Sequence, residues 1–73
     1  MKDTVRLTIF RDVRQLKYVL WIMTRATRSL EYARLNFETE IAAQKAQRGL
    51  AKAFALDGQI VQIDDGVKEI TNI

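Results

Sequence analysis

The chain has 73 residues, 48% of them hydrophobic, a formal net charge of +3, and no cysteine, histidine or proline. A domain of this length buries only about 60% of the surface that its unfolded chain exposes, and neither disulfides nor a metal site built on cysteine or histidine can reinforce it. We therefore treat residues 1–73 as one domain, which depends on an unusually apolar core or on association with a partner.

The first predicted element is a strand over residues 4–10. Hydrophobic and polar residues alternate strictly there, and β-branched residues are frequent. The alternation places one set of side chains on each face. The apolar set is Val5, Leu7 and Ile9, and the polar set is Thr4, Arg6 and Thr8. We expect a half-buried strand.

A helix is predicted to follow this strand. Asp12 can serve as its N-cap, with Gln15 three residues later completing a capping box. The apolar residues then recur at helical spacing: Val13, Leu16, Leu20, Met23 and Leu30. The polar segment 24–29 is the expected break, and Thr27 or Ser29 could begin a second helix.

The second helix is predicted to run from this break to Asp57-Gly58, a pair that typically ends a helix. Apolar residues lie on two of its sides, which predicts that neighbours cover both, one of them on a second subunit or a partner. Residues 59–63 then read as a strand, Asp65-Gly66 as a hairpin turn, and residues 67–73 as the return strand. The expected fold is α+β with the order β-α-α-β-β, a helical hairpin packed on a short antiparallel sheet.

No set of residues indicates catalysis or metal binding. A serine or cysteine nucleophile needs a positioned base, normally histidine, and the chain has one serine, no cysteine and no histidine. The acidic residues near 64–69 are too few for a calcium loop, and the glycines are single and scattered. We expect a protein that is not an enzyme and that uses no metal or cofactor.

The first predicted helix carries a basic and aromatic face. Residues 1–36 contain eight basic and three acidic side chains, whereas residues 37–73 contain four basic and six acidic ones. On a helix, one arc of this basic half would hold Arg11, Arg14, Lys17, Tyr18, Trp21, Arg25 and Arg28. Such a face suits phosphates and stacked bases, or acidic and aromatic patches on a protein. The alternative is that Tyr18 and Trp21 belong to the core beneath arginine stems.

Residues 4–46 resemble the ribbon-helix-helix repressors: a strand over 4–9, a helix, and a second helix that opens on residues 27–34. The resemblance implies a homodimer whose paired strands enter the DNA major groove. Thr4, Arg6 and Thr8 would then contact bases, and the helix end near Ser29 would hold a backbone phosphate. The sequence departs from the family in lacking glycine between the helices and in having a hairpin after them.

The chain as a whole is similar to small phage proteins that take over host machinery, in its length, its basic first half and its lack of cysteine, histidine and proline. The resemblance is to inhibitors and antiterminators that bind host RNA polymerase. It implies a non-enzymatic regulator that blocks initiation and suppresses termination. No signal-peptide core follows the first residues, and the longest apolar run, 19–23, is far short of the ~20 residues that cross a bilayer. We expect a cytoplasmic protein, in the host cytoplasm if phage-encoded, that does not contact membrane.

Overall fold

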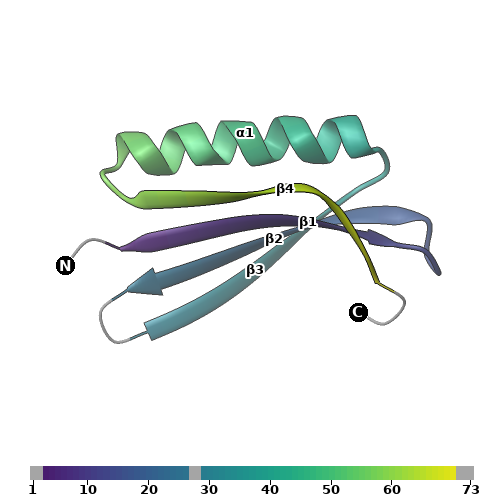
Figure 1. Cartoon of the computed structure of the whole chain (residues 1–73), viewed down its shortest axis with the longest axis horizontal. Helices are drawn as coiled ribbons and strands as arrows, with labels where there is room; N and C mark the ends of the chain where they lie inside the picture. Colours follow the sequence, from purple (N-terminus) through teal and green to yellow (C-terminus); the bar gives the residue numbers. More distant parts are fainter. Residues whose placement is uncertain (1–2, 27–28, 71–73) are drawn as a thin grey trace.

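The computed structural model describes residues 3–26 and 29–70, which form one sheet and one helix (Figure 1). Its elements are, in chain order, β1 (Thr4–Asp12), β2 (Lys17–Ala26), β3 (Ser29–Phe37), α1 (Glu40–Leu56) and β4 (Ile60–Ile70). The strand order is β3-β2-β1-β4; β2 is antiparallel to both neighbours, and β1 runs parallel to β4. The predicted β-α-α-β-β order is therefore wrong, since the residues assigned to a helical hairpin form two strands and one helix.

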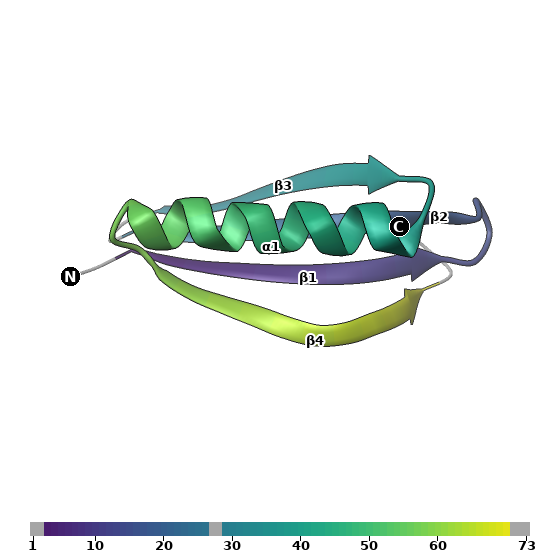
Figure 2. The same cartoon turned by 90° about the horizontal axis from the view of Figure 1, so that it is seen from above.

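The helix lies along one face of the sheet and leaves the other face bare (Figures 1 and 2). The buried core between them consists of Val5, Leu7, Ile9, Leu20, Ala43 and Ala51. Three of these come from β1, so the alternation predicted for this strand is confirmed. No helix in the described part of the chain is long and apolar enough to cross a membrane.

Strand β2 was mistaken for a helix because both of its faces are apolar. Leu20 and Ile22 lie opposite Ile9 and Leu7 of β1 and pack toward α1. Trp21, between them, points to the bare face, where it contacts aromatic rings of the neighbouring strands. A central strand with apolar side chains on both faces has a continuous apolar run, and such a run contains helical spacings by chance.

The predicted cap at Asp12 exists but closes a turn instead of starting a helix. Its Oδ1 accepts hydrogen bonds from the backbone N–H groups of Arg14 at 3.0 Å and Gln15 at 3.2 Å. This side chain is buried and stabilises the turn between β1 and β2. Leu16 ends the turn at a φ of 52°, in the left-handed region.

The helix α1 begins later than predicted, because residues 29–37 are strand β3. The Thr39 hydroxyl accepts a hydrogen bond from the backbone N–H of Ala42 at 3.2 Å and so caps the first turn. The predicted end is confirmed: Asp57 is the C-cap, and Gly58 follows with a φ of 85°. Ala43, Gln47 and Ala51 form the buried side. Within the described chain the sheet covers that side, and cover of a second side by a subunit or partner stays a prediction.

The predicted hairpin at Asp65-Gly66 is also wrong. β4 is a single strand that bulges there, since Leu7 pairs with Ile63 but Ile9 pairs with Val67. The glycine supplies a φ of 77° within the bulge. The left-handed conformation that a turn at Asp65-Gly66 requires is present at Gly66, although the chain continues along β1 instead of reversing. β4 pairs with β1 in parallel orientation, so the sheet is mixed and not antiparallel as predicted.

Candidate functional site

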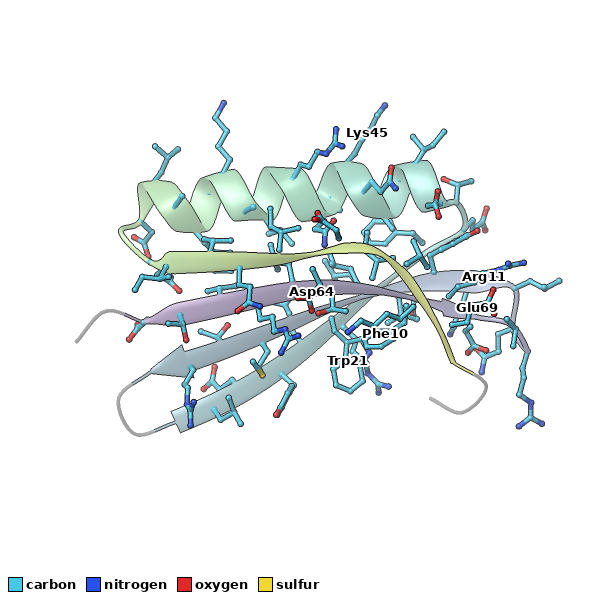
Figure 3. All side chains as sticks on the ribbon, viewed as in Figure 1. Phe10, Arg11, Trp21, Lys45, Asp64 and Glu69 are labelled. Carbon is cyan, nitrogen blue, oxygen red and sulfur yellow. The ribbon has the colours of Figure 1, made fainter. Side chains whose placement is uncertain are left out.

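Three aromatic rings lie in a row on the bare face of the sheet, which we call the open face. Phe10 of β1, Trp21 of β2 and Tyr32 of β3 project away from α1; Figure 3 labels the first two below the sheet. The Phe10 and Trp21 centroids are 5.7 Å apart at an interplanar angle of 68°, and those of Trp21 and Tyr32 are 5.9 Å apart at 73°. These edge-to-face contacts fix the rings relative to one another. We call the three residues the aromatic row.

The aromatic row is accessible at its β3 end. Tyr32 is 57% exposed, whereas Phe10 and Trp21 are half-buried. A shallow hollow of about 540 Å³ lies against Trp21, Tyr32, Ala33 and Arg34. A second hollow, of about 220 Å³, extends from the row toward β4. The open face therefore offers both a ring to stack on and space beside it.

The Trp21 indole lies at the centre of the aromatic row, and its N–H group donates no hydrogen bond among the described residues. Its Nε1 atom is buried. A buried donor without a partner costs on the order of 1–3 kcal/mol, so a ligand acceptor that reached it would remove that cost. The Arg34 guanidinium carbon lies 5.9 Å from the centroid of the indole, within the range of a cation–π interaction.

Cationic side chains surround the aromatic row. Arg25 follows Trp21 and Met23 on the same side of β2, and Arg34 lies opposite Trp21 on β3. Arg6 and Lys68 line the smaller hollow, from β1 and β4. The acidic residue lining that hollow is Asp64, and Arg6 neutralises it through an ion pair of 2.8 Å. The open face is thus apolar at its centre and positively charged around it.

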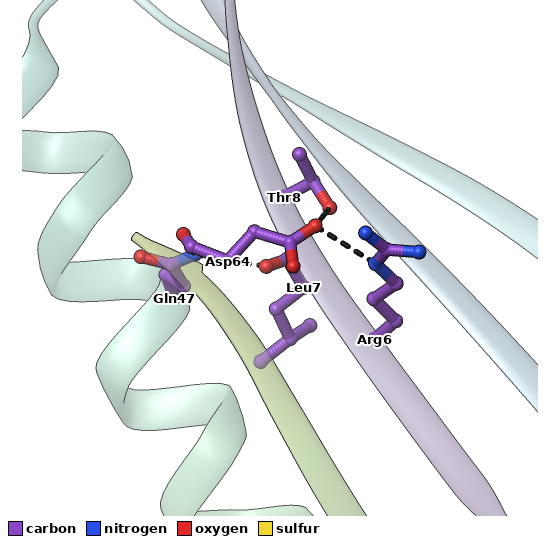
Figure 4. A network of polar contacts seen from close by, with 5 residues as sticks. All are labelled: Arg6, Leu7, Thr8, Gln47 and Asp64. Carbon is purple, nitrogen blue, oxygen red and sulfur yellow. Dashed lines mark hydrogen bonds and ion pairs between the residues drawn. The ribbon is translucent and has the colours of Figure 1, made fainter. Parts of the chain in front are cut away.

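Asp64 joins the open face to the helix through one polar network (Figure 4). Its Oδ2 accepts hydrogen bonds from Arg6 Nε at 2.8 Å and from the Thr8 hydroxyl at 2.6 Å. The hydrogen bonds from Arg6 and then Thr8 lower the pKa of the Asp64 carboxyl below its usual value of 3.8. From the other side of the sheet, Gln47 Nε2 reaches the Asp64 carbonyl at 3.5 Å. This network orients Arg6 at the edge of the smaller hollow.

The predicted helical arc is divided among different parts of the molecule. Trp21 and Arg25 lie on the open face, but Tyr18 packs against the core on the α1 side. Arg11 lies at the end of β1, where its Nη1 is 3.5 Å from Glu69 Oε1, and Arg14 lies in the turn. Arg28 lies outside the described residues. The arc is wrong because it assumed a period of 3.6 residues for a segment with a period of two.

The residues predicted to contact DNA do not form the predicted ribbon-helix-helix arrangement. Thr4, Arg6 and Thr8 do share one face of β1, as predicted. However, β1 pairs with β2 on one edge and with β4 on the other, so it has no free edge for a ribbon across a two-fold axis. Ser29 begins a strand and not a helix, and its side chain lies outside the described residues. The ribbon-helix-helix arrangement is therefore overturned.

Three members of the site were not predicted: Phe10, Tyr32 and Arg34. Residues 30–36 alternate between the two faces of β3, with Leu30, Tyr32 and Arg34 on the open side. The sequence does not show this alternation, because each face mixes apolar and charged residues: Leu30, Tyr32 and Arg34 on one, Glu31, Ala33 and Leu35 on the other. Leu30, Ala33 and Phe37 instead fit a helical stripe.

No family model, curated protein or solved structure matches the chain. Within residues 3–26 and 29–70, no cluster of three or more acidic, histidine or cysteine side chains could hold a metal ion. The candidate site is therefore defined by the geometry of the open face.

Proposed function

We propose that this protein is a non-enzymatic, cytoplasmic regulator of transcription that binds single-stranded nucleic acid on its open face. The observation that carries the proposal is the aromatic row within a rim of cationic side chains. Proteins that bind single strands combine aromatic rings, on which bases stack, with positive charge that follows the phosphates. Tyr32 offers the exposed ring, and Arg25, Arg34 and Lys68 offer the charge.

A single strand suits this face better than a duplex. Proteins that read the major groove present polar side chains to base edges. Here the centre of the face is apolar, with Trp21 and Met23 beside Tyr32. Unpaired bases expose their flat faces, and their stacking on aromatic rings is the usual mode of single-strand recognition on a sheet.

Direct binding separates this proposal from the alternatives. Fluorescein-labelled single-stranded RNA, single-stranded DNA and duplex DNA would be titrated with the full chain at low salt, with fluorescence anisotropy as the readout. Each stacked base contributes about 1–3 kcal/mol, so Tyr32→Ala should weaken single-strand binding by roughly 5- to 150-fold. Arg34→Ala should also weaken it and reduce its salt dependence.

Arg48→Ala is the matched control, because Arg48 is exposed on α1, away from the open face. It removes the same charge and should change the affinity little. Equal losses from Arg34→Ala and Arg48→Ala would show binding by net charge alone and contradict the proposal. So would tighter binding to the duplex, or no binding to single strands at tens of micromolar protein.

Host RNA polymerase is the second candidate partner, since tryptophan, tyrosine and arginine also dominate protein–protein hot spots. Inhibited initiation and suppressed termination would follow from that partner. Pull-down from host lysate with and without nuclease treatment, at moderate and high salt, distinguishes the two. Retained polymerase that is lost on Tyr32→Ala would assign the open face to a protein partner, whereas nucleic acid released by salt would support single-strand binding.

A further inference from the structure

The outer edge of β3 is unpaired within the described chain. β3 is the last strand in the order β3-β2-β1-β4, and it pairs with β2 at every position from Ser29 to Phe37 without a register shift. Its other edge consequently presents backbone N–H and C=O groups in a regular row. A regular unpaired edge is a template for another strand.

The other edge of the sheet is protected in a way that β3 is not. β4 carries the bulge at residues 64–66, which interrupts the regular backbone. Bulges, prolines and lysines are the usual devices that prevent edge pairing. Residues 29–37 contain no proline and no lysine, and their pairing with β2 shows no bulge, although Glu31 and Arg34 place one charge on each face. The β3 edge therefore keeps a regular backbone, whereas the β4 edge does not.

Apolar side chains are exposed on both sides of β3. Leu30 is 47% exposed on the open side, beside Tyr32. Leu35 is 42% exposed on the side that faces α1, because the helix does not extend over this edge (Figure 2). A strand that joined this edge would bury apolar surface on both faces.

We propose that β3 pairs antiparallel with β3 of a second copy of this chain. Such pairing places a two-fold axis perpendicular to the sheet, so both helices lie on one side and both open faces on the other. With the axis at Ala33, the midpoint of the strand, all nine residues are paired. Tyr32 then lies opposite the partner's Arg34, a favourable cation–aromatic pair, and no like charges are opposed.

Neighbouring registers are less favourable. An axis at Arg34 would place two guanidinium groups directly opposite each other, and like charges in that position destabilise a pair of strands. An axis at Tyr32 would leave two residues of each strand unpaired. The sequence of β3 is thus complementary to itself at one register, which identifies a second copy as the occupant of this edge.

The assembly would extend the open face. Two aromatic rows would lie on one continuous surface, and each Tyr32 would receive a cation from the partner's Arg34. The association involves Tyr32 and Arg34 of the open face, but it needs no nucleic acid and is measured in its absence.

Sedimentation equilibrium on the full chain, from about 5 µM to 1 mM, tests the pairing. The wild-type chain should form dimers. Ala33→Lys and Ala33→Glu should each raise the dimer Kd by roughly tenfold or more, because identical charges would meet at the axis. An equimolar mixture of the two variants should recover the dimer, since lysine then faces glutamate.

Ala33 is exposed, so both variants should keep the fold, which far-ultraviolet circular dichroism would verify. Ala55→Lys, an exposed alanine on α1, is the matched control and should dimerise as the wild type does. Amide hydrogen exchange of the unmodified chain should also show protection in β3 that increases with concentration. A monomeric wild type at 1 mM, or folded single variants that dimerise undiminished, would overturn the proposal.

Discussion

Gln47 donates a hydrogen bond of 3.0 Å from its side-chain amide to the backbone carbonyl of Leu7, forty residues earlier in the chain. The bond lies where the register of β4 against β1 shifts, between the pairs Leu7↔Ile63 and Ile9↔Val67. Gln47 is buried on the side of α1 that faces the sheet. A helix side chain thus supplies a donor where the ladder of backbone hydrogen bonds is interrupted.

Replacing Gln47 with leucine should therefore lower the free energy of unfolding by about 1–3 kcal/mol, because a buried carbonyl would lose its donor. Urea denaturation followed by circular dichroism measures this change. Gln44→Leu, one turn earlier on the same helix, removes an amide with no hydrogen bond among the described residues and should shift stability by less than about 0.5 kcal/mol. Equal effects of the two substitutions would exclude the bridging role of Gln47.

Asp64 should make stability depend on pH in the acidic range. Because Arg6 and Thr8 lower the pKa of Asp64 in the folded state, its contribution is complete above the ordinary value of 3.8. That contribution is lost as the pH falls through the lower folded-state pKa. Asp64→Asn should cost on the order of 1 kcal/mol at pH 7, and the difference from wild type should shrink as the pH falls below about 4.

The neighbouring Asp65→Asn is the control for this titration, since Asp65 is exposed and its carboxylate makes no hydrogen bond within the described chain. Thermal unfolding across the pH range gives both curves. A constant gap between wild type and Asp64→Asn down to pH 2 would be inconsistent with the carboxylate network.

Two glycines should respond in opposite directions to substitution. Gly66 has a φ of 77°, so Gly66→Val should lower the free energy of unfolding by at least about 1–2 kcal/mol, although nothing lies within 4 Å of the new Cβ. Gly49 lies inside α1 with equally open surroundings, so Gly49→Ala should raise stability by about 1 kcal/mol. Melting temperatures of both variants provide the test, and destabilisation by both would point to contacts outside the described residues.

Leu16 should be replaceable with a gain in stability. It combines a φ of 52° with 75% exposure, so its side chain contributes strain and little burial. Leu16→Gly should raise the free energy of unfolding by up to about 1 kcal/mol, because glycine adopts this conformation without steric cost. Gln15→Gly, at the preceding position of the same turn, should give no gain. Denaturant unfolding of both variants measures these changes in the free energy of unfolding.

The sequence predicted local chemistry more reliably than element type. The alternation over residues 4–10 and the stop at Asp57-Gly58 were sufficient to place β1 and the end of α1. Asp12 and Asp65-Gly66 were correctly recognised as capping and left-handed positions. These local signals do not determine whether the chain continues or reverses after them, because that depends on pairing with distant strands.

The candidate site was predictable only in part for the same reason. The sequence predicted Trp21 and Arg25 as partner-binding residues, but it placed their neighbours one helical turn away. In the fold, the companions are Phe10 and Tyr32, which strand pairing brings to Trp21 from both sides. Cross-strand neighbours follow from the register, and a single sequence does not specify the register of a central strand with two apolar faces.

The parallel pairing of β1 with β4 has a consequence for the order of folding. β1, β2 and β3 are consecutive and antiparallel, so they can pair as soon as residues 4–37 have left the ribosome. The second edge of β1 must wait for β4, whose Val61 pairs with Val5. Until then the nascent chain leaves that edge of β1 unpaired, and this is the period in which it is most prone to aggregation. If this docking is the last step, destabilising substitutions in β4 will act mainly on the unfolding rate and leave the folding rate almost unchanged.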